Sequence, residues 1–342
     1  MSPWFKNILA KQPQRHREEV QKDFSAKTLI SVVTPTLRRP NEVAGLLQNL
    51  CEQTMSPAEI ILVDGAPESE KQTEDVVQSL SDTLPFPCRY IRHSRGTAVQ
   101  RNAGIDLARG SLIAFIDDDV RLEPDFLRTC FEVFAQDARA GGVVGYRTNQ
   151  HFRLASHQRW RWYRRLKLLT TFEPGRYDFE TGYPINANMQ PPFSGVREVD
   201  FMTTACAVWR REVFESGIRF DPFFSDYGVL EDAHFSLRAG REWKLFQCGD
   251  ARCVELHSAN GRVNQRKLGY KYVVNYYYVF RTVAGPLSLR QQARFWRYQA
   301  FELFRIATSA IRRRRAAEVG ELLGRLEGAF SVARGTAFRR AD

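Results

Sequence analysis

Residues 96–120 read GTAVQRNAGIDLARGSLIAFIDDDV, and they contain a helix pattern, an apolar run and an acidic end in direct succession. The helix pattern occupies the first half and is stopped by a glycine. Residues 111–116 (SLIAFI) then form the kind of apolar run that is typical of a buried strand. The run leads into three consecutive carboxylates, Asp117, Asp118 and Asp119. This order predicts a helix-to-strand unit that carries an acidic cluster at the carboxyl end of its strand.

The acidic triplet stands out because the chain has a formal net charge of +11. Adjacent carboxylates repel one another, so a fold tolerates them best beside a divalent cation or a set of hydrogen-bond donors. Side chains alternate along a strand, which would place Asp117 and Asp119 on one side. Their hard oxygens suit Mg²⁺ or Mn²⁺, and these ions suit phosphate oxygens. The alternative is a solvated acidic turn that opens the next helix, since Asp is favoured there.

The sequence around the triplet alternates regularly between strand and helix patterns. Strands are predicted at residues 28–34, 59–63, 89–92 and 111–116, and helices at residues 41–53, 70–80, 97–108 and 124–135. Such alternation predicts an α/β fold with a mostly parallel sheet and helices on both faces. Ligands of these sheets lie beyond the carboxyl ends of the strands. Thr34-Pro35-Thr36, Asp64 and the acidic triplet all lie at strand ends, so we expect them to line one crevice.

Length and composition narrow the class of protein. The chain has 342 residues, of which 43% are hydrophobic and 26% charged, as in a globular protein of one large domain or two. It lacks an apolar stretch of the roughly 18 residues that a membrane span needs, and its first residues lack the apolar core of a secretory signal. We therefore expect an intracellular protein. The six cysteines are scattered and form no CxxC pair, which favours reduced, mostly buried thiols.

No phosphate-binding glycine motif accompanies the predicted sheet. The sequence has neither the GxGxxG turn of dinucleotide-binding domains nor the GxxxxGK[ST] of a P-loop. The sequence therefore favours binding of a nucleotide diphosphate through a metal ion and carboxylates.

Four segments together resemble a known family. Residues 30–40 (ISVVTPTLRRP), 59–66 (EIILVDGA), 96–120 and 227–240 (YGVLEDAHFSLRAG) are similar, in this order, to the motifs of family 2 glycosyltransferases of the GT-A fold. The resemblance covers about two thirds of the chain, from residue 28 to residue 257. It implies a mixed, mostly parallel sheet flanked by helices. It also implies transfer of a sugar from a UDP-, GDP- or dTDP-sugar donor, with inversion at the anomeric carbon.

The resemblance also assigns roles to individual residues. The donor would be contacted by Thr34, Pro35, Thr36, Asp64, Arg101, Asp117 and Asp118, with Asp64 at the position that binds the base. A Mn²⁺ or Mg²⁺ ion would be held by Asp119, Asp117 and His257. Asp232, helped by Glu231, would be the general base that takes a proton from the acceptor hydroxyl. An acid at the start of the helix predicted for residues 233–239 would also be explained by the helix dipole alone.

The remaining sequence suggests a division into three parts. Residues 1–27 form a basic, amphipathic N-terminal segment, residues 28–260 the GT-A domain, and residues 261–342 a helical, arginine-rich extension. Within the domain, residues 28–147 would bind the nucleotide-sugar and residues 148–260 the acceptor. In the extension, four apolar residues recur near helical spacing before an arginine run: Tyr298, Phe301, Phe304 and Ile311. This pattern favours binding to an anionic membrane surface, with packing on the catalytic domain or an interface in a homo-oligomer as alternatives.

Two other classes of protein share some of these features. A nucleotidyltransferase would also have a doubly wound sheet and metal carboxylates, but its nucleotide loop is usually rich in glycine. A basic nucleic-acid-binding protein would explain the sequence pI of about 9.5, but not the acidic clusters. The sequence therefore favours a glycosyltransferase that does not bind nucleic acid. We expect it to extend a cell-envelope glycan or glycolipid in the cytoplasm, peripherally on the inner face of the membrane.

Overall fold

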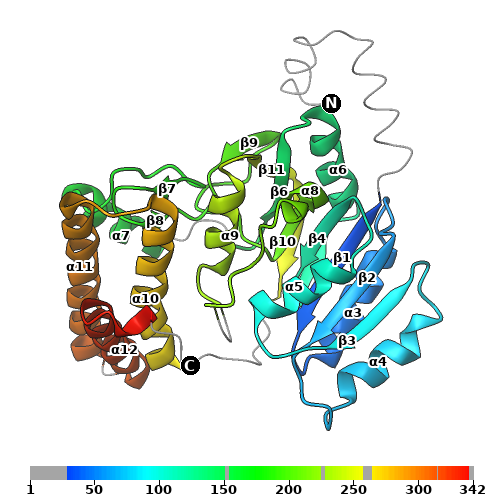
Figure 1. The fold of residues 1–342 in the computed structure, drawn as a ribbon, viewed down its shortest axis with the longest axis horizontal. Helices are drawn as coiled ribbons and strands as arrows, with labels where there is room; N and C mark the ends of the chain where they lie inside the picture. Colours follow the sequence, from blue (N-terminus) through cyan, green and yellow to red (C-terminus); the bar gives the residue numbers. More distant parts are fainter. Residues whose placement is uncertain (1–28, 151–153, 225–227, 257–263, 314, 339–342) are drawn as a thin grey trace. The chain divides into compact units, whose positions relative to one another are not determined.

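The computed structural model describes residues 29–150, 154–224, 228–256, 264–313 and 315–338 (Figure 1). The chain divides into two compact units. The sheet unit comprises residues 1–152 and 187–258, and the helical unit comprises residues 153–186 and 259–342. The helical unit thus takes in residues 153–186, which the sequence-based division grouped with the sheet.

The sheet unit is built on one mixed sheet, in which the described strands follow the order β3-β2-β1-β4-β10-β6-β11-β5, with β9 paired to β11 (Figure 1). Its strands are β1 Ile30–Thr36, β2 Glu59–Asp64, β3 Cys88–Arg92, β4 Leu112–Ile116, β5 Val120–Leu122, β6 Ala140–Arg147, β9 Val196–Val199, β10 Cys206–Arg210 and β11 Lys244–Glu255. Its helices are α3 Pro40–Cys51, α4 Gln72–Ser81, α5 Thr97–Leu107, α6 Phe126–Gln136, α8 Arg211–Glu215 and α9 Glu231–Ala239.

The pairing of the strands confirms the predicted fold class. β1 pairs in parallel with β2 and β4, and β3 extends the parallel set beside β2. β10 is antiparallel to β4 and β6, while β6 and β11 are again parallel. The apolar strands β1, β2 and β4 are buried along their whole length, as expected where both faces are covered. Helix α3 begins at Pro40, one residue before the predicted start, and proline is favoured in the first helical turn.

Helix α5 lies unusually close to the sheet. A Cβ atom at Gly104 would overlap the side chain of Val33 in β1, so only glycine permits this approach. Arg101 lies about one turn earlier on the same face of α5 and is only 3% exposed. The close packing therefore places a buried guanidinium beside the carboxyl ends of the parallel strands.

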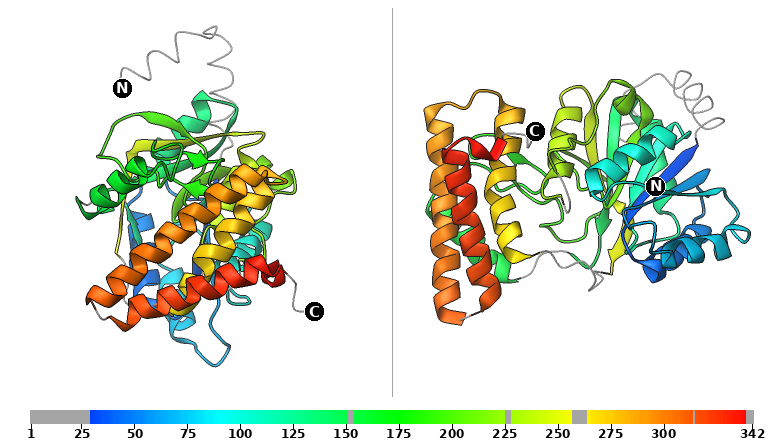
Figure 2. Two further views of the ribbon diagram at one scale, coloured as in Figure 1. Left: turned by 90° about the vertical axis from the view of Figure 1, so that its left-hand side faces the viewer. Right: turned by 60° about the horizontal axis from the view of Figure 1, so that its bottom comes forward.

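Among its described residues, the helical unit is dominated by the long helices α10, α11 and α12 (Figure 2). Its elements are α7 Leu154–Arg165, α10 Gln265–Ala284, α11 Leu289–Arg313, α12 Ala316–Ala333, the 3-10 helix Thr336–Phe338, and the strands β7 Tyr177–Asp178 and β8 Tyr183–Pro184. Helices α10 and α12 pack closely, because a Cβ at Gly324 would overlap the backbone carbonyl of Arg266. The fully buried Glu302 of α11 accepts a 2.6 Å hydrogen bond from Tyr163 and pairs with Arg159 at 2.9 Å.

The helices and the cysteines bear on two predictions from the sequence. Over the described residues, none of the helices has a stretch that is both long and apolar enough to cross a bilayer. Cys130, Cys206, Cys248 and Cys253 are buried and Cys51 is exposed, and all are free thiols. The prediction that most of the six cysteines are buried is therefore confirmed.

Candidate active site

The carboxyl ends of β1, β2 and β4 meet at one edge of the sheet. The parallel register places Thr36 beside Asp64, and β4 ends at Ile116, directly before the acidic triplet. The Thr36 hydroxyl donates a 2.7 Å hydrogen bond to Oδ2 of Asp118, although the two residues are far apart in sequence. The structure thus brings together the segments that the sequence places at strand ends.

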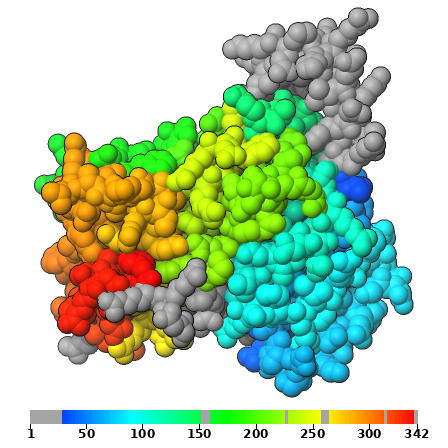
Figure 3. Space-filling view, viewed as in Figure 1, coloured from blue at the N-terminus to red at the C-terminus, as the bar shows by residue number. Residues whose placement is uncertain are grey.

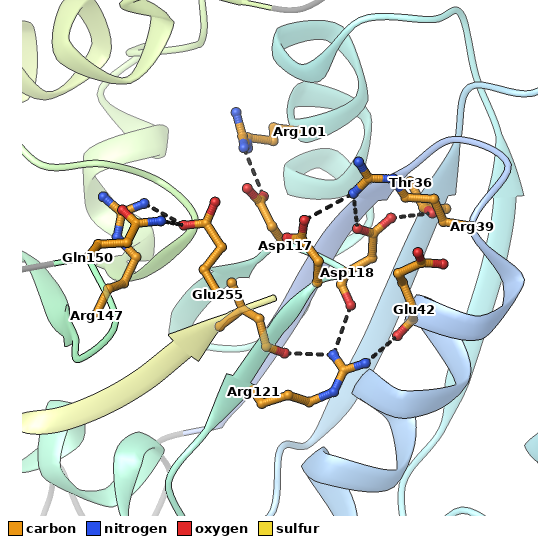
Figure 4. Close-up of polar contacts among 12 residues, drawn as sticks. Thr36, Arg39, Glu42, Arg101, Asp117, Asp118, Arg121, Arg147, Gln150 and Glu255 are labelled. Atoms are coloured by element: carbon orange, nitrogen blue, oxygen red, sulfur yellow. Dashed lines mark hydrogen bonds and ion pairs between the residues drawn. The ribbon is translucent and has the colours of Figure 1, made fainter. Parts of the chain in front are cut away.

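Asp118 is the most enclosed member of the triplet, at 3% exposure. Its Oδ2 accepts from Thr36, and its Oδ1 pairs with a terminal nitrogen of Arg39 at 2.8 Å (Figure 4). Burial raises the pKa of Asp118 to about 6, while Arg39 and Thr36 act in the opposite direction. Both oxygens of Asp118 are therefore engaged within the protein, which fixes the orientation of this carboxylate.

Asp117 and Asp119 lie in the turn after the strand rather than on it. The turn is closed by a 3.1 Å hydrogen bond from the Val120 amide to the Asp117 carbonyl. The expectation that strand alternation orients the two residues is therefore wrong, because β4 ends before them. Arginines hold them instead. Arg39 lies 3.3 Å from Oδ2 of Asp119. Arg101 lies 3.0 Å from Oδ1 of Asp117 (Figure 4).

A further arginine supports the backbone of the triplet. Arg121 donates to the carbonyls of Asp118 and Glu42 at 2.9 and 3.1 Å (Figure 4). It also donates to the Val120 carbonyl at 2.8 Å. Sequence reasoning missed the roles of Arg121 and Arg39. The sequence does indicate that basic residues must lie near the triplet, because three adjacent carboxylates need positive charges beside them. With 50 Lys and Arg residues in the chain, this indication could not identify which of them supply the charge.

Arg101 connects the triplet to the second acidic motif. Its two terminal nitrogens lie 3.0 Å from Oδ1 of Asp117 and 3.2 Å from Oε1 of Glu231. Its guanidinium also lies 5.6 Å from the ring centre of Phe220. Thr97, one turn earlier on α5, donates to the same Glu231 oxygen at 3.1 Å. A buried arginine therefore bridges two carboxylates that come from different parts of the sheet unit.

Glu231 and Asp232 form the first turn of α9. The preceding Leu230 has the left-handed backbone angles φ 69° and ψ 15°, a strained geometry that in proteins is concentrated at functional sites. Oδ1 of Asp232 accepts a 2.7 Å hydrogen bond from the Ala233 amide. Burial, with a further contribution from Glu231, raises the pKa of Asp232 to about 7, while Arg101 opposes the rise. Glu231 contacts Arg101 and Thr97, so the helix dipole alone does not account for this acidic pair.

Asp64 is fully buried at the end of β2 and both of its oxygens have partners. The Tyr90 hydroxyl donates to Oδ2 and the Ala66 amide donates to Oδ1, each over 2.8 Å. Thr34 is also fully buried, and its hydroxyl donates to the Ile116 carbonyl at 2.7 Å, which ties β1 to β4. Pro35 is buried within β1 between Thr34 and Thr36.

A second buried arginine lies on the β6 and β11 side of the site. Arg147, only 7% exposed, pairs with Oε2 of Glu255 at 2.7 Å, and Gln150 donates to the same oxygen at 2.5 Å (Figure 4). Arg147 also favours the charged form of Asp232, since it acts to lower the pKa of that carboxyl. The sequence contained no motif that singled out this pair.

The carboxylates of the triplet are chemically suited to a divalent cation. Carboxylate oxygens are the ligands that Mg²⁺ and Mn²⁺ prefer, and Asp119 has the weaker of the two contacts to Arg39. Within the described residues, no three His, Cys, Asp or Glu side chains are placed to hold one ion together. His257, the third predicted ligand, lies outside the described residues. The carboxylate oxygens of the triplet therefore suit such an ion. An ion bound there would neutralise the triplet together with Arg39.

We expect Arg39→Gln to destabilise the protein. The change leaves the buried Asp118 carboxylate without its charged partner, which costs about 1–3 kcal/mol of folding free energy. Mn²⁺ should then raise the thermal unfolding midpoint of the variant more than that of the wild type, because the ion replaces the missing charge. Arg139→Gln is the matched control, since the exposed Arg139 lies 4.0 Å from Asp137. An Arg39→Gln protein as stable as the control would contradict this role.

The sheet unit that contains this site is similar to known proteins. Residues 31–217 match the family model described as Glycosyl transferase family 2. An uncharacterized glycosyltransferase of Haemophilus influenzae is 33% identical over 111 residues, which are 32% of this chain and 35% of that protein. A glucosyl-dolichyl phosphate glucuronosyltransferase of Haloferax volcanii is 28% identical over 120 residues, 35% of this chain and 37% of that protein. The chain thus matches little more than a third of the length of these relatives.

Solved structures extend the similarity of fold over more of the chain. A mannosyltransferase of Pyrobaculum calidifontis, solved in complex with GDP-Man and Mn²⁺, aligns with a TM-score of 0.53. The alignment covers 96% of this chain and 84% of the other, at 16% sequence identity. At this identity the similarity shows that the two proteins share a fold.

Proposed function

Because the chain belongs to glycosyl transferase family 2, we propose that it is an inverting glycosyltransferase, which moves a sugar from a nucleotide-sugar to an acceptor hydroxyl. One observation carries this proposal: Arg101 joins the acidic triplet at the strand ends to Glu231, directly before Asp232. A donor site and a catalytic carboxylate are thereby held in one unit. Membership of this family supports this function over a nucleotidyltransferase or a non-catalytic nucleic-acid-binding protein.

The donor nucleotide would lie across the carboxyl ends of β1 and β2. Asp64, held by Tyr90 and the Ala66 amide, would accept from an N–H group of the base. Thr34, Pro35 and Thr36 would form the floor beneath the nucleotide.

The ribose would lie toward Asp117 and Asp118 in the turn after β4. For Arg101 we propose a positioning role rather than phosphate binding, because its terminal nitrogens already donate to Asp117 and Glu231. In this way Arg101 would hold the carboxylates of the donor site at a fixed distance from those of the catalytic motif.

Asp119 and Asp117, with His257, would hold a Mn²⁺ or Mg²⁺ ion when the donor binds. The ion would supply positive charge that stabilises the departing nucleoside diphosphate. Mn²⁺ in the mannosyltransferase complex supports this expectation. Arg39 contacts both Asp118 and Asp119. When the ion binds Asp119, Arg39 would stay beside Asp118 and neutralise that carboxylate.

Asp232 would act as the general base. The acceptor oxygen attacks the anomeric carbon from the face opposite the diphosphate, and the bond from that carbon to the phosphate oxygen breaks. The hydroxyl proton passes to Asp232, and the electron pair of the broken bond leaves with the nucleoside diphosphate. The raised pKa of Asp232 makes it a better proton acceptor than an ordinary carboxylate. A single displacement of this kind inverts the configuration of the sugar.

The acceptor we propose is a cell-envelope glycan or a lipid-linked sugar. One relative is named a glucosyl-dolichyl phosphate glucuronosyltransferase, which supports a lipid-linked acceptor. Such acceptors lie at a membrane, so we place the enzyme in the cytoplasm, peripherally on the inner face of the cytoplasmic membrane.

A nucleotide screen tests the proposed function. We expect one of UDP, GDP or dTDP, in the presence of Mn²⁺, to raise the thermal unfolding midpoint of the full chain. At a hundredfold excess over its dissociation constant, the ligand should add about 2.7 kcal/mol of stability. The matching nucleotide-sugars should then be hydrolysed slowly, with water in place of the acceptor. Stabilisation by an oligonucleotide and by none of the nucleotides would contradict a glycosyltransferase.

A further inference from the structure

Helix α11 presents one exposed face that lacks acidic residues. Seven positions spaced three or four residues apart are all exposed: Leu289, Ala293, Arg297, Ala300, Phe304, Thr308 and Ile311. Phe304 is 67% exposed and Ile311 78%. The buried face carries Phe295, Tyr298 and Ile306. Of the residues that the sequence pattern grouped together, Tyr298 therefore belongs to the core, and Phe304 and Ile311 are available for contact.

Helix α12 presents a second exposed apolar face. Its members recur every three or four residues: Ala316, Val319, Leu323, Leu326, Phe330 and Ala333. The four larger side chains are 44–56% exposed. The opposite side of α12 carries Gly324, Gly328 and Val332, which pack within the unit. Contiguous exposed apolar surface of this kind usually marks a site of interaction.

Helices α11 and α12 meet at one end of the unit, and the positive charge of this region lies on α11 and the junction. Residues 289–315 contain eight arginines and one glutamate, whereas residues 316–333 contain one arginine and three glutamates. Figure 2 shows α11 (orange) and α12 (red) running from a common junction, and Figure 3 shows both at the surface of the unit. Residues 289–334 contain ten arginines and four glutamates, a net charge of +6 out of +11 for the chain. Glu302, the one acidic residue of α11, is fully buried. Glu321 pairs with Arg325, and Glu327 with Arg266, so most of the acidic charge here is neutralised.

We propose that the exposed faces of α11 and α12 together bind the surface of an anionic phospholipid membrane. Apolar side chains flanked by arginines suit the boundary between lipid headgroups and acyl chains, where the apolar groups insert and the guanidiniums contact phosphate. Because α11 and the junction are positively charged, a second copy of the chain placed against them would bring like charges together, whereas an anionic bilayer complements them. The inference deepens the peripheral location proposed for the enzyme, and it requires no glycosyl transfer.

Vesicle sedimentation tests this surface with the full chain. Vesicles of phosphatidylcholine with about one third phosphatidylglycerol should bind the wild type at least tenfold more tightly than phosphatidylcholine alone, and rising salt should weaken binding. The double variant Phe304→Gln/Ile311→Gln should lose at least tenfold in binding, as should Leu323→Gln/Phe330→Gln. Both change exposed side chains, and unfolding midpoints equal to the wild type would show that the fold is kept.

Two controls separate this inference from its alternatives. Leu29→Gln changes a leucine of the sheet unit that is 54% exposed, and it should bind vesicles as the wild type does. Asp232→Asn should also bind normally, which separates membrane binding from catalysis. Equal binding of the two double variants and the wild type would overturn the proposal. So would a wild-type dimer that these variants dissociate, because the surface would then be an interface between copies.

Discussion

Asp232→Asn is expected to reduce the rate of glycosyl transfer by about 10²–10⁴-fold, the usual contribution of a general base. Asparagine has the same shape and can still accept the hydrogen bond from the Ala233 amide, so the start of α9 should be preserved. The fold should be at least as stable at neutral pH, because the change removes a partly desolvated charge beside Glu231. The measurement is kcat with the nucleotide-sugar selected by the screen, together with the dissociation constant of the nucleoside diphosphate.

The dissociation constant should stay within about twofold of the wild type, because Asp232 contacts neither Asp64 nor the triplet in any hydrogen bond described. Asp75→Asn, an exposed aspartate of α4, is the matched control and should keep full activity. In the wild type, kcat/KM should fall about tenfold per pH unit below the raised pKa of Asp232, because the base must be ionised. An Asp232→Asn enzyme that turns over within tenfold of the wild type would exclude this residue as the base.

Asp119→Ala is expected to abolish the Mn²⁺-dependent stabilisation of the protein by its nucleoside diphosphate. The wild type should gain about 2.7 kcal/mol at a hundredfold excess of the ligand, and the variant almost nothing. Stability without ligand should change little, because Arg39 keeps its closer contact with Asp118. The measurement is the shift in unfolding midpoint with the nucleotide alone, with Mn²⁺ alone and with both.

Asp75→Ala removes an exposed carboxylate from the same unit and should respond to Mn²⁺ and nucleotide as the wild type does. If Asp119→Ala kept the full shift with both ligands, the metal would have to be held elsewhere. If the wild type were stabilised equally by nucleotide with and without Mn²⁺, the enzyme would bind its donor without an ion. In that case Arg39 and Arg101, which contact carboxylates of the triplet, would supply positive charge beside it.

Much of the site could be located from the sequence, because its anchors are local. Asp64 and the acidic triplet follow apolar strands, and parallel strands bring their carboxyl ends to one edge. The contacts of these carboxylates could not be located in this way. Arg39 and Tyr90 belong to neighbouring strands or loops, and their contacts depend on register and rotamers that no local pattern encodes. The sequence also predicted the orientation of the triplet wrongly. The three aspartates lie in the turn after β4, so the alternation of side chains along a strand does not apply to them.

The sequence by itself determined the alternation of strands and helices, the family motifs and the positions of the carboxylates, because these depend on residue type and on spacing along the chain. Only the tertiary structure decided which charges face one another. Arg101 reaches Asp117 and Glu231 because Gly104 lets α5 approach β1. The tertiary structure also decided that Tyr298 is buried while Phe304 is exposed, since both fit one helical pattern and only packing against other helices separates them.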